Sequence, residues 1–283
     1  MQATPLIPDS TACPPLEHGI FHRTALLLGS RRMRVIADAR GLVIGLGGVG
    51  SWCAESLVRT GVRHLTIMDS DRVCITNINR QIQATCSTIG QVKTEALRNR
   101  LLDINPQADI VSVQRIYDQD SAAGIPFDDY DFIVDAIDSV SAKALLLATA
   151  SRSRAQVFSS LGAASKLDPT RVRVAELWDV KGCPLGAALR RQMRRQQLVT
   201  AKPIPTVYSD EVLANAGESH SCGTSQCLCP HTDAGPGDPE LLNHEWCSRK
   251  AVINGSVAHI TGIFGLMLAG LVIQGLGSGC DAD

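Results

Sequence analysis

The sequence lacks both a net charge and a long apolar stretch at its beginning. Its 27 lysines and arginines nearly balance 28 aspartates and glutamates, so the formal net charge of the 283 residues is −1. This balance excludes a surface that is basic all over, although a local patch would suffice for RNA. The opening MQATPLIPDSTACPP has no continuous apolar run, which excludes a signal peptide. We expect a loose leader over residues 1–17 and a cytoplasmic protein.

The cysteines lack the paired CxxC…CxxC spacing of many zinc sites. Of the ten cysteines, six are scattered, whereas Cys222, Cys227, Cys229 and Cys247 crowd into a segment rich in glycine and proline. In a reducing compartment, such crowding suggests metal or redox chemistry more than disulfides. The four could ligate zinc or an iron–sulfur centre; a reactive or sulfur-accepting thiol and inert cysteines are the alternatives. We expect residues 214–250 to form a loop that crosses over the active site.

The first half of the chain contains a glycine-rich turn between apolar segments. GLGGVGS follows the apolar GLVI, precedes WCAESLVRTG with its helical spacing, and is followed by the apolar HLTIMD. Strand, glycine turn, helix and strand in this order begin a doubly wound sheet. Gly45 allows the tight turn and Gly50 permits close packing of the helix. Gly47 and Gly48 let backbone amides approach a phosphate. We therefore expect an α/β fold with a Rossmann-like, mostly parallel sheet that binds a nucleotide.

Acidic residues follow two of the apolar segments. Asp69 and Asp71 come at the end of HLTIMD, and Asp138 ends YDFIVDAID. Because the carboxyl ends of parallel strands meet at one edge, we expect these carboxylates around one crevice. Asp69 could hold the ribose of any adenine nucleotide, so it does not separate NAD from ATP. Asp138 could also cap the helix that follows it.

The segment TNINRQIQ, residues 76–83, lacks the apolar periodicity of a core helix. Hydrogen-bond donors cluster in it and shortly beyond it: Asn77, Asn79, Arg80, Gln81 and Lys93. Arginine offers a planar fork and lysine a point charge for phosphate oxygens. Nothing between Asp69 and Lys93 suits the proton transfer or the nicotinamide of a dehydrogenase. The cluster therefore indicates ATP rather than NAD, and Asp138 would then hold Mg²⁺.

Together these motifs resemble a known superfamily. GLGGVGS, the D-x-D pair, NINRQ, the lysine and DAID occur in order across residues 41–143, as they do in the ubiquitin-activating-enzyme-like superfamily, in its ThiF/MoeB/HesA group of ATP-dependent adenylating enzymes. The resemblance implies that Asp69 binds ribose. It implies that Asn79, Arg80 and Lys93 bind or activate the phosphates, and that the carboxylate of DAID supports Mg²⁺.

The same resemblance implies a homodimer in which an N-terminal arginine reaches the neighbour's ATP. The segment HRTALLLG is similar to that region, and Arg23 is its best match, although Ile20 stands where related sequences often carry a second arginine. The expected catalytic residues are therefore Arg23, Arg80, Lys93 and Asp138.

Residues 18–213, which we expect to form the adenylating domain, resemble one subgroup, the tRNA threonylcarbamoyladenosine dehydratases. VCITNINRQI, DAIDSVSAK, GAASKLDPTRVRVAEL and CPLGAALRRQMRR carry this likeness. It implies ATP-dependent activation of a carboxylate on a tRNA nucleoside, followed by ring closure. The alternatives are activation of the C-terminal glycine of a ubiquitin-like sulfur carrier, an NAD-binding oxidoreductase and a non-catalytic metal or redox module. The missing paired CxxC disfavours the first, and NINR with Lys93 disfavours the second. A sulfur-transfer protein is a further candidate partner.

Two segments of the second half have open interpretations. RRQMRR, residues 190–195, places four arginines on about one and a half helical turns. It could be a solvated face or a contact to tRNA phosphates, which Arg171 and Arg173 could extend. VAHITGIFGLMLAGLVIQ is apolar but short for a membrane span. We expect a helix within residues 251–275, buried on all sides in the core or in a dimer interface, and a disordered tail over residues 276–283.

Overall fold

The computed structural model describes residues 19–217, 231–232, 235–236 and 254–277. The expected leader lies outside the described residues, as do all but two residues of the expected tail. Four cysteines of the expected crossover loop also lie outside them: Cys222, Cys227, Cys229 and Cys247. The predictions of a metal centre or a reactive thiol in that loop therefore remain predictions.

The centre of the molecule is a seven-stranded sheet in the order β3-β2-β1-β4-β5-β7-β6. All neighbouring strands are parallel except β6 and β7, which are antiparallel. This sheet confirms the predicted α/β, mostly parallel fold. The strands are β1 Arg40–Ile44, β2 His64–Met68, β3 Asp109–Val113, β4 Phe132–Asp135, β5 Gln156–Ser160, β6 Val172–Glu176 and β7 Pro205–Ser209.

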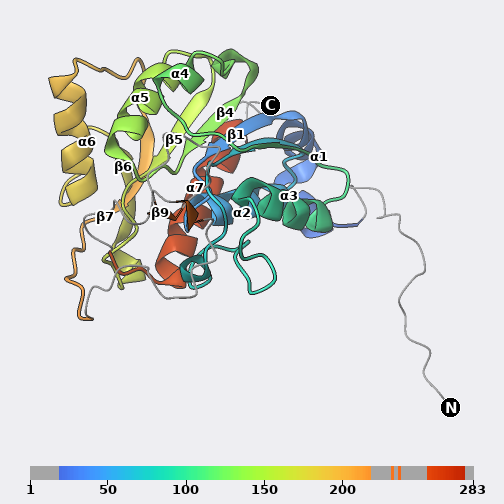
Figure 1. Ribbon diagram of the computed structural model, residues 1–283. Helices are drawn as coiled ribbons and strands as arrows, with labels where there is room; N and C mark the ends of the chain where they lie inside the picture. The colour runs from blue at the N-terminus through green and yellow to red at the C-terminus, as the bar shows by residue number, and fades with distance from the viewer. Residues whose placement is uncertain (1–18, 218–230, 233–234, 237–253, 278–283) are drawn as a thin grey trace.

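Helices cover both faces of this sheet (Figure 1). Along β1, Val43 points into one hydrophobic core, and Leu42 and Ile44 point into the other. The first core lies against α1, α2, α3 and α7, and the second against α4, α5 and α6. This burial on both faces explains why the strands read as apolar runs rather than as alternating patterns. The helices are α1 His22–Asp38, α2 Gly50–Thr60, α3 Lys93–Ile104, α4 Gln119–Ala122, α5 Val140–Ala150, α6 Pro184–Arg195 and α7 Ala258–Gly277.

Short elements complete the described chain. They are the 3₁₀ turns η1 Ile75–Asn77, η2 Phe127–Asp129 and η3 Pro169–Arg171, and the antiparallel pair β8 His231–Thr232 and β9 Gly235–Pro236. Of these, η1 overlaps the start of the donor-rich segment that the sequence singles out, so that segment begins in a turn and not in a core helix.

The apolar C-terminal helix α7 packs on α2 and on the sheet. Ile260, Phe264, Leu268 and Val272, spaced four apart, are fully buried on one side of it, whereas Leu266 is 49% exposed. Within the described part of a single chain, the expected burial on all sides is therefore met on one side only, because α7 covers the outside of α2. Length and composition alone would allow α7 to cross a membrane, but core helices pass the same test and half of its most apolar stretch is buried.

The strand order sets β1 beside β4 at the centre of the sheet. The chain moves outward from β1 to β2 and β3 on one side, and from β4 to β5 on the other, so these two central strands form a topological switch point. Ligands of doubly wound sheets bind at the carboxyl ends of such strands. The glycine turn follows β1, and Asp138 follows β4, so both lie at this edge.

Candidate nucleotide site

The glycine turn between β1 and α2 is fixed by a backbone hydrogen bond of Gly45 and by the close packing of Gly50 against it. Gly45 has a φ of +90°, a left-handed conformation that favours glycine, and its N–H donates to Met68 O at 2.9 Å. A Cβ built on Gly50 would lie 1.8 Å from the carbonyl oxygen of Gly45. A Cβ on Gly47 would meet no atom within 4 Å, whereas one on Gly48 would touch Thr261. The turn therefore presents Gly47 to open space, where a phosphate could approach its backbone.

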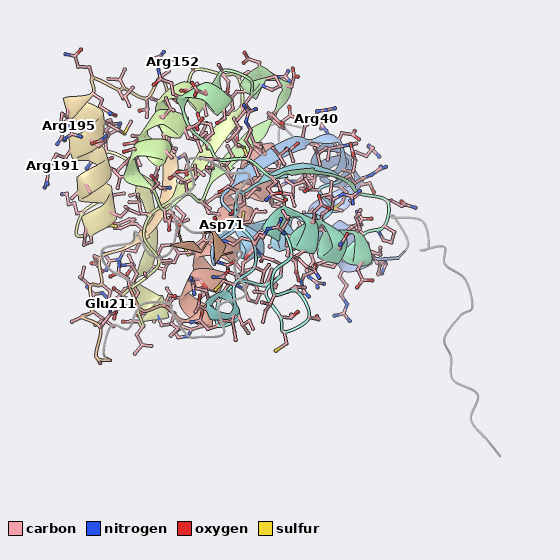
Figure 2. All side chains as sticks on the ribbon, viewed as in Figure 1. Arg40, Asp71, Arg152, Arg191, Arg195 and Glu211 are labelled. Carbon is pink, nitrogen blue, oxygen red and sulfur yellow. The ribbon has the colours of Figure 1, made fainter. Side chains whose placement is uncertain are left out.

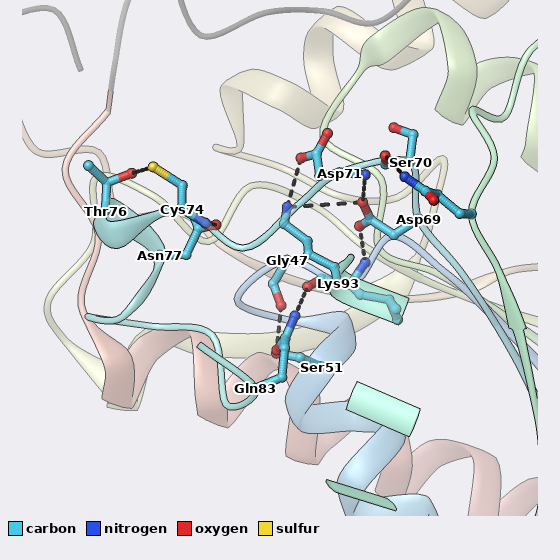
Figure 3. Close-up of polar contacts among 12 residues, drawn as sticks. Gly47, Ser51, Asp69, Ser70, Asp71, Cys74, Thr76, Asn77, Gln83 and Lys93 are labelled. Atoms are coloured by element: carbon cyan, nitrogen blue, oxygen red, sulfur yellow. Dashed lines mark hydrogen bonds and ion pairs between the residues drawn. The ribbon is translucent and has the colours of Figure 1, made fainter. Parts of the chain in front are cut away.

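Asp69, at the end of β2, fixes the glycine turn to the neighbouring strand (Figure 3). Its Oδ2 accepts from Leu46 N at 2.6 Å, and its Oδ1 accepts from Asp71 N at 2.8 Å. Lys93, the first residue of α3, points its ammonium at this pair of carboxylates. Its Nζ donates to Asp71 Oδ2 at 2.7 Å and lies 4.0 Å from Asp69 Oδ1. Three residues expected to bind nucleotide are thus brought into one cluster.

The cluster keeps Lys93 charged although the side chain is only 6% exposed. Burial alone would lower the pKa of Lys93, but the carboxylates of Asp69, Asp71 and Asp138 raise it above its ordinary value. Burial raises the pKa of Asp69, and the neighbouring Lys93 ammonium opposes that shift. Lys93 therefore stays protonated beside the glycine turn and can donate to a phosphate oxygen, although the surrounding carboxylates outnumber it.

The structure divides the NINRQ donors into two groups. Asn77 is buried and its Oδ1 accepts from Cys74 N at 2.9 Å, so its amide closes the η1 turn (Figure 3). Gln81 is also buried, at 5% exposure. Asn79 and Arg80 lie nearer the surface. The Arg80 guanidinium donates to Thr76 O and to Asn79 Oδ1, both at 2.8 Å. Asn79 and Arg80 are the two that remain accessible to a ligand.

Three hydrogen bonds that sequence reasoning missed stabilise the glycine turn and the NINRQ segment. Gln83 Nε2 donates to Leu46 O at 2.9 Å, and Ser51 Oγ donates to Gly47 O at 2.7 Å, so both brace the glycine turn (Figure 3). Trp52 Nε1 donates to the backbone oxygen of Arg80 at 3.0 Å. Ser51 and Trp52 directly follow the glycines and Gln83 directly follows NINRQI, so adjacency in sequence is the signal that could have found them.

Asp138 lies exposed in the loop between β4 and α5. Its charge contributes to the raised pKa of Lys93, which places it in the same electrostatic environment. Ser139, not Asp138, occupies the N-cap position of α5, so the capping alternative is wrong. Within the described ranges no group of three or more His, Cys, Asp and Glu side chains could hold a metal ion. A single carboxylate nevertheless suits Mg²⁺, which in proteins is often held by one or two carboxylates and substrate phosphates.

A fully buried ion pair lies beneath the loop that carries Asp138. Lys143 Nζ donates to Asp135 Oδ2 at 2.5 Å and to Ser160 O at 2.8 Å. Ser159 Oγ donates to the same Asp135 oxygen at 2.7 Å, and Ile137 N donates to Oδ1 at 3.1 Å. The pair joins the ends of β4 and β5 to α5, so it fixes the start of the Asp138 loop. Sequence reasoning assigned it no role.

Arg23 lies exposed in the first turn of α1, outside this cluster. Its reach into a partner's site remains a prediction. The glycines, Asp69, Asp71 and Lys93 are brought together by direct contacts, and Asn79 with Arg80 forms a neighbouring surface group.

Comparison with protein families decides among adenylating enzymes, dehydrogenases and other nucleotide-binding folds. The model of the ThiF family matches residues 21–281. The chain belongs to the ThiF family. This match confirms the resemblance seen in GLGGVGS, NINRQ and DAID, and it extends through α7.

Individual relatives of this ThiF-family chain share a name. It is 39% identical to the tRNA threonylcarbamoyladenosine dehydratase of Escherichia coli (strain K12) over 174 residues, which are 62% of this chain and 65% of that protein. It is 34% identical to the protein of the same name from Bacillus subtilis (strain 168) over 193 residues, which are 68% of this chain and 74% of that protein. The aligned part thus falls slightly short of two thirds of the E. coli protein.

Solved structures extend the likeness over nearly the whole fold. The crystal structure of the E. coli tRNA N6-threonylcarbamoyladenosine dehydratase, TcdA, in complex with ATP matches with a TM-score of 0.73 at 29% identity. The match covers 92% of this chain and 94% of that chain. The ThiF-family fold seen here is therefore shared with a protein that has been solved with ATP bound.

Proposed function

We propose that this protein uses ATP to activate the carboxylate of threonylcarbamoyladenosine in tRNA and closes it to the cyclic form. The carrying observation is the Lys93 ammonium, held charged by Asp69 and Asp71 beside a glycine turn with an open face at Gly47. The dehydratases of E. coli and B. subtilis, and the ATP complex of the E. coli enzyme, support this substrate and this nucleotide.

The chemistry explains why ATP is needed. A free carboxylate resists attack by a neighbouring nucleophile because the oxygen would have to leave as hydroxide. Transfer of AMP from ATP to a carboxylate oxygen gives an acyl adenylate and releases pyrophosphate. Attack on the acyl carbon from within the same nucleoside closes the ring and releases AMP. The nucleoside thereby loses one water, and positioning with charge neutralisation suffices without a side-chain nucleophile.

Each site residue has a role that fits its position. Asp69, which directly follows β2, would accept hydrogen bonds from the ribose while its Oδ2 holds the glycine turn through Leu46 N. Lys93 would stabilise the charge of the phosphates. Arg80, with its guanidinium positioned by Asn79, would bind phosphate oxygens from the other side of the turn.

Asp138 would hold the Mg²⁺ that accompanies ATP. Mg²⁺ would neutralise the charge that develops on the phosphates as pyrophosphate leaves. The exposed position of Asp138, and its charge coupling to Lys93, are compatible with a bound Mg²⁺ and ATP phosphates between them.

Further parts of the proposal concern partners. We infer a homodimer in which Arg23 reaches the ATP of the neighbouring subunit, because this arginine is exposed on α1 and the family resemblance implies that role. A cytoplasmic location follows from a tRNA substrate. A sulfur-transfer protein is an additional candidate partner, to be sought by co-purification.

Pyrophosphate release with different carboxylate donors tests the proposal. The protein is incubated with ATP and either tRNA carrying threonylcarbamoyladenosine, the same tRNA without the modification, or a small protein ending in Gly-Gly. We expect pyrophosphate only with the modified tRNA. Release that requires the Gly-Gly protein would replace the proposal with activation of a sulfur carrier.

A further inference from the structure

The arginines of α6 form a basic surface that the nucleotide site does not use. Arg191, Arg194 and Arg195 are exposed, and Arg190 is half-buried with its Nη1 donating to Leu177 O at 3.1 Å. The opposite side of the helix is anchored in the core by Leu189 and Met193, among other residues. Figure 2 shows Arg191 and Arg195 at one edge of the molecule, on α6. The helix is therefore fixed by its apolar side and presents guanidinium groups outward.

These arginines have no carboxylate partner among the residues that the structure describes. Arg194 lies over the ring of Trp178 at 5.7 Å, and Arg195 donates to Gln192 Oε1 at 2.5 Å. The two arginines around the start of β6 behave differently. Arg171, at the end of η3, pairs with Asp210 at 2.9 Å, and Arg173 lies 3.7 Å from the same carboxylate. Arg171 and Arg173 thus share one carboxylate, whereas the described residues offer none to the arginines of α6.

A groove lies between α6 and the first residue of α5. It has a volume of about 220 Å³ and is lined by Val140, Ala188, Arg191, Gln192 and Arg195. We call it the α6 groove. Val140 is the first residue of α5 and stands two residues after Asp138, a span of at most about 7 Å along the chain. The α6 groove therefore has one lining residue close to Asp138, the residue proposed to hold Mg²⁺.

We propose that the α6 groove binds the sugar–phosphate backbone of the tRNA next to the nucleoside that is modified. This inference rests on the proposed function, since it needs an RNA substrate at the nucleotide site. Uncompensated guanidinium groups favour phosphate, and arginine can bind two phosphate oxygens at once. Contacts to phosphates do not distinguish one base from another, so the groove would position the RNA and the active site would recognise the nucleoside.

The formal net charge of −1 makes a local cluster of arginines relevant to RNA binding. A chain that carries no general excess of positive charge has little long-range attraction for RNA, so its RNA contacts must come from such a patch. The same groove could in principle take an acidic protein. RNA is favoured because the guanidinium groups line a groove, and because Val140 of that groove stands two residues after Asp138.

Charge reversal of the two groove arginines tests the proposal. The test variant is R191E/R195E, and the conservative variant is R191K/R195K. A charge reversal away from the groove, R40E at the first residue of β1, is the control; Arg40 is labelled on the other side of Figure 2. Binding of modified and unmodified tRNA is measured over a salt series. Nucleotide binding and thermal unfolding of each preparation report whether the variants are folded.

We expect R191E/R195E to bind both tRNAs about tenfold more weakly for each arginine–phosphate interaction removed, and to show a salt slope smaller by about 2. R191K/R195K should recover most of the affinity, and R40E should match the wild type. Wild-type affinity and slope in the reversed variant would overturn the inference. So would unchanged tRNA affinity accompanied by weaker binding of the small protein ending in Gly-Gly, measured under the same conditions. Wild-type protein that binds tRNA through the groove yet releases no pyrophosphate would refute the proposed function alone.

Discussion

At the scale of single residues, the candidate site contains charged side chains that form ion pairs with one another. Lys93 is the clearest case, because its ammonium lies near two carboxylates, and one of these, Asp69, also anchors the glycine turn and the end of β2. The sequence indicated Lys93, Asp69 and Asp71 as ligand residues from their types and order. It could not reveal that they bond to each other, because pairing depends on how α3 lies against the end of β2.

Replacing Lys93 should therefore affect both activity and stability. In K93M the phosphate donor is absent, and we expect the rate of pyrophosphate release to fall by about 10²–10³-fold. Two partly buried carboxylates are left without their cation, which should lower the free energy of unfolding by about 1–3 kcal/mol. Urea unfolding and single-turnover kinetics measure the two effects. The double variant K93M/D71N should regain stability but not activity; recovery of activity would contradict the phosphate role.

The buried pair of Lys143 and Asp135 gives a second prediction at this scale. K143M leaves a carboxylate with no exposure and no cationic partner, so we expect the free energy of unfolding to fall by about 3–5 kcal/mol. The double variant K143M/D135N, which carries neither charge, should recover most of it. A single variant as stable as the wild type in urea would show that the pair does not hold the β4–α5 junction.

At the scale of elements, the glycine turn and α2 act as one unit. Sequence reasoning anticipated a tight turn at Gly45 and close packing at Gly50, and both are seen as a positive φ and a backbone approach. These features could be predicted because glycine is required by local geometry. The braces from Ser51 and Gln83 could not, since those residue types are compatible with many surroundings.

The two kinds of glycine in this turn should respond differently to an added methyl group. G50A places a Cβ against Gly45 O, so we expect the melting temperature to fall markedly. G47A meets open space and should retain the melting temperature while ATP binds more weakly, because the methyl group would occupy the approach to the backbone. Thermal unfolding and ATP titration separate the cases. Unchanged ATP affinity in G47A would remove Gly47 from the phosphate contact.

The junction that follows β7 should make the fold sensitive to acid. Glu211 accepts from the backbone N–H groups of Leu167 and Asp168, and these bonds lower its pKa. A carboxylate with a lowered folded-state pKa stabilises the fold above its unfolded pKa, about 4.3 for glutamate, and that stability is lost as the pH falls through the folded value.

We therefore expect the free energy of unfolding to decrease below about pH 4.3, and to decrease less steeply in E211Q. Urea unfolding at a series of pH values measures both slopes. Parallel slopes for the two proteins would show that Glu211 does not contribute to the acid response.

At the scale of the whole molecule, the order of the strands places the site. The parallel sheet, with the glycine turn and Asp138 at one edge of it, could be predicted from apolar runs separated by glycine and acidic residues. The antiparallel strand β6, the packing of α7 on α2 and the groove beside α6 could not. Each of these depends on contacts between distant segments, such as Val49 with Gly265, that no local pattern encodes.

The central claim joins this topology to a single reaction on tRNA. It is tested most directly by mass spectrometry of nucleosides from tRNA carrying threonylcarbamoyladenosine, after incubation with the protein with and without ATP. We predict a nucleoside lighter by one water that forms only with ATP and is absent with R80A or K93M. An unchanged modified nucleoside, in a preparation shown to bind ATP and that tRNA, would contradict the account.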